Sequence, residues 1–297
     1  MMKVLVPVDG SESSMQAAEY ALKTVTADPS VDVTLASVPW RYESAYFADA
    51  MYEAEKVNKD FIILFGERLK KVKKLFDDAG VPVKAELLSE GDPAKIVTYY
   101  VEKKGFDEVI LGSRDLSSIK GIVLGGVAYK VLSDVKVPVT VVMPDINIGR
   151  LKEGSLVKVL VAVDGSDNSI RVAEYVLKMS RANPAVKVTL LSVACHYDAA
   201  YFADTWVGED IPNKKCLEES TKVLTRAKAV FDHAGVPAKS ELLMGDPGTR
   251  IISYIENKDI DRVIMGSRGL NPFIGMVLGS VAYKVLNSVK VPVTVIK

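Results

Sequence analysis

The chain has 297 residues, of which 48% are apolar and 26% are charged, and its formal net charge is zero. That length predicts about two domains of a soluble globular protein. A neutral chain argues against a nucleic-acid partner or an anionic membrane partner, and no apolar run is long enough to span a membrane.

The start of the chain and its two cysteines indicate the cellular compartment in which the protein is expected. Residues 3–8 already form an apolar strand pattern, and no signal-peptide pattern precedes them. Cys195 and Cys216 lie outside any Cys-x-x-Cys motif, so we expect neither a disulfide framework nor a redox pair. These features together favour a cytoplasmic protein.

In chain order, the first half alternates strands with helices. Asp92 caps a helix in which Pro93 takes the first position, and Gly80 ends the helix before it, which Pro82 prevents from continuing. The pattern predicts strands at 3–9, 31–38, 83–88, 108–111 and 138–142, and helices at 12–26, 53–79, from 93 onward and near 126–135. Strands separated by helices pair in parallel through right-handed crossovers, which indicates an α/β sheet.

The second half repeats the first. Residues 3–11 (KVLVPVDGS) recur as residues 158–166 (KVLVAVDGS), at an offset of 155 residues. Further matches are 45–49 with 200–204 (AYFAD), 79–82 with 234–237 (AGVP) and 91–93 with 245–247 (GDP), the last at an offset of 154. A period this long, seen twice, indicates a duplicated domain and not a solenoid. The composition between the halves predicts a linker at 144–155 that joins domains at 1–143 and 156–297.

A glycine-rich stretch late in the second half carries the strongest functional signal. Gly266 and Gly269 follow a predicted strand at 262–265, and Gly279 with Ser280 opens a predicted helix. Glycines let backbone N–H groups approach an anion, and a helix N-terminus adds unpaired donors and the positive end of the helix dipole. The stretch therefore predicts a phosphate site, with a turn that only reverses the chain as the alternative.

Strand ends bring further residues toward this stretch. Asp9 and Asp164 end the first strand of each half, and Gly112 and Gly266 end the fourth. In such sheets ligands bind at the carboxyl ends of strands, where the strand order reverses. Both ends of one half can therefore line a single nucleotide crevice. Asp164 either contacts the ligand there or only forms the Asp-Gly-Ser turn.

Each half resembles a universal stress protein domain, since a strand with Asp-Gly-Ser precedes Gly-x-x-Gly, nine residues and Gly-Ser. The resemblance covers nearly the whole chain. It implies a doubly wound, five-stranded parallel sheet of the adenine nucleotide alpha hydrolase-like type, ATP held between the first and fourth strand ends, and a stress-response role. Mg²⁺ is expected to enter with the nucleotide, because phosphates commonly hold it.

Carried onto this sequence, the resemblance implies a nucleotide site in the second half, with Asp164 at the nucleoside and Val193 at the adenine. The implied binding residues are Ala162, Val163, Asp164, Val193, Gly266, Ser267, Arg268, Gly269, Gly279, Ser280 and Val281.

The first half departs from this motif at two positions. Asp115 replaces the second glycine and Gly126 replaces the serine, while Asp9, Gly112 and Gly125 keep the pattern. A carboxylate about 4 Å from a phosphate, at an effective dielectric near 20, costs on the order of 4 kcal/mol, or roughly a thousandfold in affinity. Unless Asp115 points to solvent, the first domain is expected to bind ATP poorly or not at all.

Two other functions stay open on the sequence: a slow ATPase or nucleotide-transfer enzyme, and an interaction scaffold that binds another small ligand. The Walker and dinucleotide patterns are missing from the sequence, and no general base lies near the glycine-rich stretch, which argues against efficient hydrolysis. The AYFAD segments are expected to pack in the core, with a flap or a protein-docking surface as the alternative. Uncharged last strands at 137–141 and 291–295, read with the family resemblance, predict an intramolecular pseudo-dimer, and a homodimer also stays open.

Overall fold

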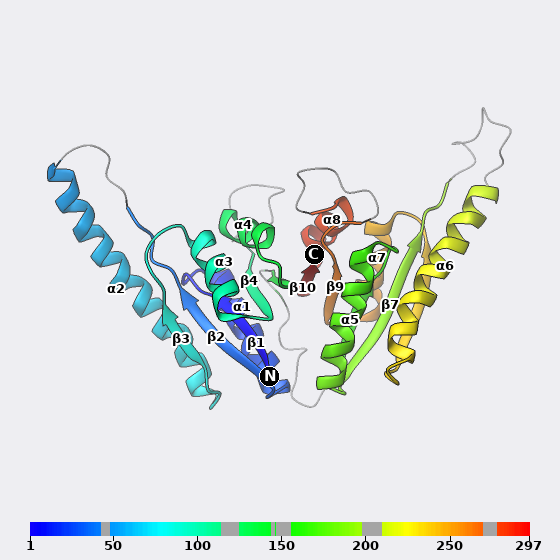
Figure 1. The fold of residues 1–297 in the computed structure, drawn as a ribbon, viewed down its shortest axis with the longest axis horizontal. Helices are drawn as coiled ribbons and strands as arrows, with labels where there is room; N and C mark the ends of the chain where they lie inside the picture. The colour runs from blue at the N-terminus through cyan, green and yellow to red at the C-terminus, as the bar shows by residue number, and fades with distance from the viewer. Residues whose placement is uncertain (43–47, 114–124, 144–145, 147–155, 198–209, 270–277) are drawn as a thin grey trace. The chain divides into compact units, whose positions relative to one another are not determined.

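A computed structural model describes the chain except for residues 43–47, 114–124, 144–145, 147–155, 198–209 and 270–277 (Figure 1). The chain divides into two compact units, Met1–Glu153 and Gly154–Lys297. The expected linker, apart from Ile146, lies outside the described residues, and so does the second AYFAD segment. The packing of the two domains through their last strands stays a prediction.

The elements of each unit follow the predicted alternation of strand and helix. The first unit contains β1 (Met2–Pro7), α1 (Glu12–Ala27), β2 (Val31–Ser37), α2 (Ala48–Asp78), β3 (Lys84–Leu87), α3 (Pro93–Lys104), β4 (Glu108–Gly112), α4 (Gly126–Asp134) and β5 (Val139–Val142). The second contains β6 (Val157–Ala162), α5 (Asp167–Ala182), β7 (Val186–Ala194), α6 (Asp210–Asp232), β8 (Ala238–Met244), α7 (Pro247–Lys258), β9 (Arg262–Gly266), α8 (Ser280–Ser288) and β10 (Val293–Ile296).

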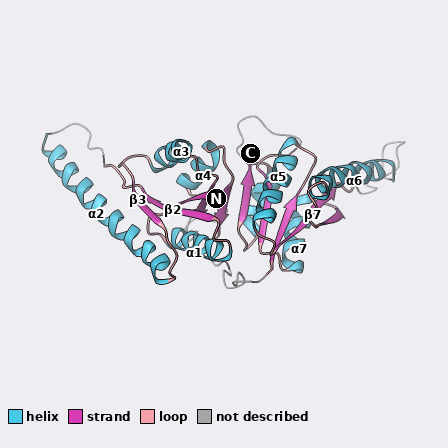
Figure 2. Ribbon diagram, turned by 60° about the horizontal axis from the view of Figure 1, so that its bottom comes forward, coloured by secondary structure: helices cyan, strands magenta, loops and turns pink. Residues whose placement is uncertain are grey.

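Both units have the same sheet topology. The strand order is β3-β2-β1-β4-β5 in the first unit and β8-β7-β6-β9-β10 in the second, and the described pairs within each unit are parallel. Helices lie on both faces of the strands, with α1 beside α2 and α3 beside α4 (Figure 2). The predicted α/β fold is thus confirmed. The strand order reverses between β1 and β4 and between β6 and β9, where ligands bind in such sheets.

Equivalent aromatic residues anchor the two cores. Phe76 of α2 and Phe231 of α6 are fully buried, and each packs against the branched side chains of the central strands, such as Leu35 and Leu190. Strands that are covered on both faces read as almost continuous apolar runs. The strands that lead to the candidate site are therefore packed within the hydrophobic core of each unit.

Helix ends confirm the start and stop signals of the sequence. Gly80 follows α2 with φ 68°, and the next N–H, of Val81, donates to the Phe76 carbonyl at 2.9 Å. The C-cap of α3 is Gly105, with φ 64°, whereas the C-cap of α7 is Asp259, with φ 52°. Only glycine adopts this left-handed conformation at no steric cost, so the second copy carries a mild backbone strain that the first does not.

Buried charges distinguish the two copies. Glu108 opens β4 and accepts a hydrogen bond from Thr140, and both side chains are buried. At the equivalent place in β9, Arg262 is also buried, and its guanidinium donates to Thr294 Oγ1 at 2.8 Å and to Tyr175 Oη at 3.4 Å. The duplicated domains have therefore diverged in their interiors as well as in their loops.

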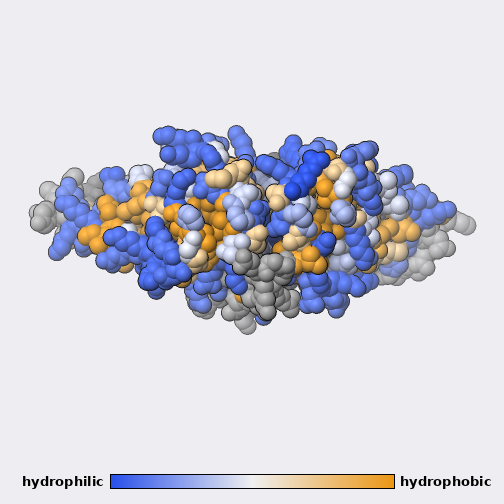
Figure 3. Space-filling view, turned by 90° about the horizontal axis from the view of Figure 1, so that it is seen from below, coloured by the Kyte–Doolittle hydropathy of each residue, from blue (hydrophilic) through white to orange (hydrophobic). Residues whose placement is uncertain are grey.

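One helix surface is apolar in the first copy only. Ile62, Ile63 and Leu64 of α2 are exposed, whereas α6 carries Leu217 followed by two glutamates at the matching positions. In Figure 3 hydrophobic residues lie among hydrophilic ones over the α2 side of the first unit. Among the described residues, no helix is both long and apolar enough to cross a membrane.

The start of α7 is held by a charged cap. Asp246 Oδ1 accepts the Thr249 N–H at 2.9 Å and the Thr249 hydroxyl at 2.6 Å, and Lys284 Nζ donates to the same oxygen at 2.6 Å. The ammonium of Lys284 and these Thr249 bonds lower the pKa of Asp246 to about 2. The carboxylate thus stays ionised far into the acid range.

Asp246→Ala is expected to lower the free energy of unfolding by about 1 kcal/mol at pH 7, mostly through the lost cap, because exposed ion pairs contribute little. The folded-state pKa lies below the ordinary value of 3.8. The stabilisation is therefore complete above about pH 4 and is lost as the pH falls through about 2. Urea unfolding across this pH range measures it, with Asp92→Ala, which removes the equivalent cap of α3, as the control. A difference that does not shrink in acid would contradict the role of the carboxylate.

Candidate functional site

Asp164, at the end of β6, has one carboxylate oxygen fixed by its own turn. Its Oδ1 accepts the Ser166 N–H at 3.0 Å, the Ser166 hydroxyl at 2.6 Å and the Ser169 hydroxyl at 2.7 Å. The residue is exposed, and with Oδ1 held in the turn its second oxygen, Oδ2, remains as a hydrogen-bond acceptor. The structure thus shows that Asp164 forms the Asp-Gly-Ser turn, and its contact with a ligand stays a prediction.

Gly269 lies directly beside that second oxygen. A Cβ placed on Gly269 would come within 2.5 Å of Asp164 Oδ2, a separation that real Cβ atoms do not adopt. The close approach joins the end of β6 to the turn after β9, which the sequence places about a hundred residues apart. The absence of a side chain at Gly269 therefore lets the Asp164 carboxylate lie close against its backbone.

The turn after β9 is tied to the start of α8. The Ser267 N–H donates to the Ile296 carbonyl at 2.7 Å, and the Ser267 carbonyl accepts the Gly279 N–H at 2.7 Å. Ser267 is only 1% exposed. Its side chain lies in the interior and its backbone holds the turn, and its contact with a ligand stays a prediction.

The N-terminus of α8 presents donors that no side chain occupies. Gly279 is the N-cap, and it makes no side-chain cap hydrogen bond because glycine has none to offer. Ser280 is exposed at the first helical position, and Val281 is partly exposed. The first N–H groups of a helix have no partner within the helix and attract anions. Free donors therefore begin at Ser280, since the Gly279 N–H already donates to the Ser267 carbonyl, and phosphate binding here stays a prediction.

Glycines at the ends of the fourth strands have a packing role. A Cβ on Gly266 would lie 3.0 Å from the Asn168 Cβ, and a Cβ on Gly112 would overlap the backbone of Ser13. Each glycine thus lets the strand end meet the first turn of the helix that follows the first strand. Arg268, next in the turn, has an exposed side chain, and its carbonyl accepts a 3.4 Å hydrogen bond from Asn168.

The remaining predicted contacts come from strand backbone. Ala162 pairs with Met265 of β9 and with Leu191 of β7, which places it between the two strands. The Val163 side chain lies in the core with 4% exposure, so only its backbone can face a ligand. Val193 lies near the end of β7 and is partly exposed. These residues follow the same carboxyl edge as Asp164.

The first unit repeats the acidic turn with a different neighbour. Asp9 Oδ1 accepts the Ser11 N–H at 2.9 Å and the Ser11 hydroxyl at 2.6 Å. Burial alone would raise the pKa of Asp9, but the hydrogen bonds from Ser11 and Ser14 outweigh it and hold that pKa below its ordinary value. Arg68 of α2 lies over this turn, and its Nη1 donates to the Asp9 carbonyl at 2.8 Å. The equivalent position in α6 of the second unit is Val223, which lies over Gly165.

The glycine pair of the first unit is partly described. Gly125 is the N-cap of α4 and makes no side-chain cap hydrogen bond, and Gly126 is the first helical residue. A Cβ on Gly126 would meet nothing within 4 Å. Asp115 lies outside the described residues, so its effect on binding stays a prediction.

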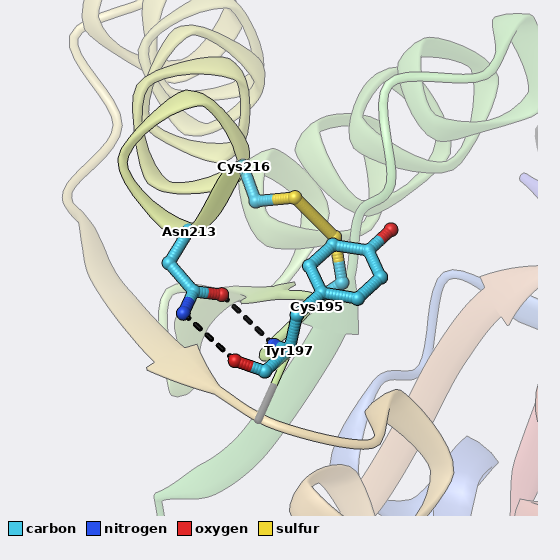
Figure 4. The surroundings of a disulfide bond; sticks show 4 residues. All are labelled: Cys195, Tyr197, Asn213 and Cys216. Carbon is cyan, nitrogen blue, oxygen red and sulfur yellow. Dashed lines mark hydrogen bonds between the residues drawn. A yellow bond between two sulfur atoms is a disulfide. The ribbon is translucent and has the colours of Figure 1, made fainter. Parts of the chain in front are cut away.

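The two cysteines were misjudged from the sequence. Cys195, just after β7, and Cys216 of α6 form a disulfide, with their Cα atoms 5.9 Å apart (Figure 4). Beside them the Tyr197 N–H donates to Asn213 Oδ1 at 2.8 Å, and Asn213 Nδ2 donates to the Tyr197 carbonyl at 3.0 Å. Spacing alone could not reveal the bond, because it depends on how α6 docks on β7.

Metal ligands do not gather in the part of the chain that the structure describes. No group of three or more His, Cys, Asp or Glu side chains there could hold a metal ion. A nucleotide that arrives with its own Mg²⁺ would have the cation bound through its phosphates.

Comparison with known proteins gives a consistent result. The Universal stress protein family model matches residues 1–143 and again residues 157–297. A universal stress protein of Methanocaldococcus jannaschii is 31% identical over 152 residues, which cover 51% of this chain and 88% of that protein. One from Mycolicibacterium smegmatis is 23% identical over 99% of this chain and 96% of its own. The crystal structure of a universal stress protein from Archaeoglobus fulgidus has a TM-score of 0.69 and 25% identity, and the likeness covers 99% of this chain and 98% of that one.

Proposed function

The chain belongs to the universal stress protein family, with two family domains in tandem, and from this premise we propose that the second domain binds ATP as a ligand or regulator in a stress response. Asp164 Oδ2 beside the bare backbone of Gly269 is the observation that carries the proposal. It brings the end of β6 and the turn after β9 together at one place, and any side chain at position 269 would collide with the acceptor.

An acceptor at Asp164 and donors at the start of α8 support a nucleotide that binds in one orientation. The Asp164 carboxylate is an acceptor and suits the hydroxyl groups of a ribose, but it would repel phosphates. The uncapped start of α8 offers backbone N–H donors and the positive end of the helix dipole, which suit phosphates. Gly269 lies between the Asp164 carboxylate and the start of α8, since it is close to both Asp164 Oδ2 and Gly279. The ribose belongs at Asp164 and the phosphates at Gly279 and Ser280.

The adenine would lie along the ends of β6 and β7. Val193 is partly exposed there, and the backbone of Ala162 and Val163 follows the same edge. Backbone N–H and carbonyl groups can read the edge of a base without a charged side chain. Val193 and the backbone of Ala162 and Val163 would determine the selectivity for adenine. Asp164 and the start of α8 would determine the affinity for the ribose and the phosphates.

Binding without efficient turnover is the expected behaviour. Donors at a helix start bind phosphates whether or not they react, and hydrolysis needs a group that activates water. The acidic group described beside Gly269 is Asp164, which we assign to the ribose. ATP is therefore expected to act as a ligand, and any Mg²⁺ is expected to enter with it.

Release of nucleotide from the purified protein tests the proposal. Full-length protein is denatured, and the released nucleotide is identified by chromatography and counted per chain. We expect an adenine nucleotide at no more than one per chain, and tighter binding of ATP than of GTP by isothermal titration. Steady release of phosphate would support the enzyme alternative, and an empty protein that ATP does not titrate would support the scaffold.

Asp164→Asn is expected to weaken ATP binding about tenfold to a hundredfold, because an amide is a weaker acceptor than a carboxylate for the ribose hydroxyls. Isothermal titration measures the change, and Asp9→Asn in the first domain is the matched control, which should leave affinity unchanged. Equal losses in the two variants would contradict the assignment of the site to the second domain.

A further inference from the structure

The disulfide joins β7, which carries Val193 of the proposed site, to α6. Cys195 directly follows β7, two residues after Val193, and Cys216 lies in the second turn of α6. Seven residues further along α6, Val223 lies on the same helical face and fills the space above Gly165, with its Cγ2 2.6 Å from where a Cβ would be. The bond therefore connects the strand end to the helix that packs on the Asp164 turn.

Small molecules can reach this disulfide. Cys195 is exposed and Cys216 is partly exposed. Exposed disulfides are the ones that thiols reduce most readily, whereas structural disulfides are buried and resist reduction. Lys214 and Lys215 precede Cys216 and are both exposed, and positive charge next to a cysteine favours the thiolate, the form that attacks a disulfide.

The first domain shows that the bond is not required to build this region. Its Tyr42 N–H donates to Asn58 Oδ1 at 2.7 Å and Asn58 Nδ2 donates to the Tyr42 carbonyl at 3.2 Å, which reproduces the Tyr197–Asn213 pair. The positions that match the two cysteines hold Trp40 and Phe61. The amide pair thus closes this segment in both copies, and the disulfide adds a second tie in one copy only.

We propose that Cys195 and Cys216 form a reversible modification site that exchanges with low-molecular-weight disulfides of the glutathione class. In the forward direction the exposed Cys195 thiolate attacks one sulfur of the small disulfide, and one small thiolate leaves. The Cys216 thiolate then attacks the Cys195 sulfur and expels the second small thiolate. The two cysteines lose two electrons and two protons, and the small disulfide becomes two thiols.

The structural consequence is local to the start of α6. With the bond closed, the first turns of α6 cannot separate from the end of β7. With the bond open, this covalent tie is lost, and the hydrogen bonds of the Asn213 side chain to Tyr197 remain. The peptide bonds after Lys214 and Lys215 should therefore open to protease more often in the reduced protein.

Equilibration of the full-length protein in glutathione buffers tests the proposal. Samples at a series of ratios of oxidised to reduced glutathione are quenched, alkylated and analysed by mass spectrometry. We expect the Cys195–Cys216 bond to form and to break reversibly, with both thiols alkylated in the reduced protein. Cys216→Ser should trap one glutathione on Cys195, the intermediate of the exchange. A bond that glutathione breaks only after the protein unfolds, or thiols that never pair, would overturn the proposal.

Tryptic cleavage after Lys214 and Lys215 gives the second readout. We expect it to be about tenfold faster in the reduced protein than in the oxidised one, since cleavage follows the population of the opened segment. Cys195→Ser with Cys216→Ser should cleave at the fast rate in every buffer. Equal rates in all samples would overturn the structural consequence. None of these readouts needs a nucleotide, so a failure of the proposed ATP site would leave this inference standing, and the reverse also holds.

Discussion

Gly269→Asp is expected to abolish ATP binding in the second domain. The new side chain would start within 2.5 Å of Asp164 Oδ2 and would bring a second carboxylate to the place proposed for the ribose and phosphates. At about 4 Å and an effective dielectric near 20, one such repulsion is on the order of 4 kcal/mol, or roughly a thousandfold in affinity. Isothermal titration should detect no binding at concentrations that saturate the wild type.

Gly269→Ala separates shape from charge in this experiment. Gly269 does not have positive φ, so alanine fits the backbone, and only the contact with Asp164 must give way. We expect an intermediate loss of about tenfold, since the Asp164 side chain can turn aside at a modest cost. Thermal unfolding should show both variants folded, because the first domain carries Asp115 at the matching place. Unchanged affinity in Gly269→Asp would refute the proposed site.

The converse experiment should create a site in the first domain. Asp115→Gly with Gly126→Ser restores the two positions at which this half departs from the motif. Removal of one carboxylate and gain of one hydroxyl donor should raise affinity by about a thousandfold or more. Space for the new serine exists, since a Cβ on Gly126 meets nothing within 4 Å. Asp9 already forms the same turn as Asp164.

The two domains must be read separately in that experiment. The graft is made in the Gly269→Asp background, so that any titration reports the first domain alone, and we expect about one nucleotide per chain. Asp115→Gly with Gly126→Ala is the matched control, which removes the repulsion but adds no hydroxyl and should bind several-fold more weakly. A folded graft that still does not bind would contradict the assignment of the difference between the domains to positions 115 and 126.

Local signals explain why the fold could be predicted. Asp92 and Pro93 start α3 as expected, and Gly80 ends α2 with positive φ, because caps and turns are fixed by the residues that form them. The approach of the β6 end, at Asp164, to the β9 end was also expected, since the carboxyl ends of neighbouring parallel strands lie at one edge. These features depend on backbone rules that the sequence displays directly.

Features that depend on packing between distant elements were not predicted. The expectation for the cysteines was wrong, because a separation of 21 residues says nothing about how α6 lies on β7. The paired replacement of Trp40 and Phe61 by Cys195 and Cys216 was the signal that could have shown two neighbouring positions. Burial of Ser267 was missed for the same reason, because this residue looks like a surface position in an isolated sequence.

The hydrogen bonds of Asn58 in α2 and Asn213 in α6 also indicate which features are older than the duplication and which are younger. Asn58 and Asn213 make the same two hydrogen bonds in both copies, so the simplest history is that the single ancestral domain already had them before it was duplicated. The disulfide occurs in one copy, and the aromatic residues occur at the same positions in the other. That difference is younger than the duplication. The chain therefore keeps the ancestral asparagine hydrogen bonds in both domains, whereas the two neighbouring positions have changed independently in each domain.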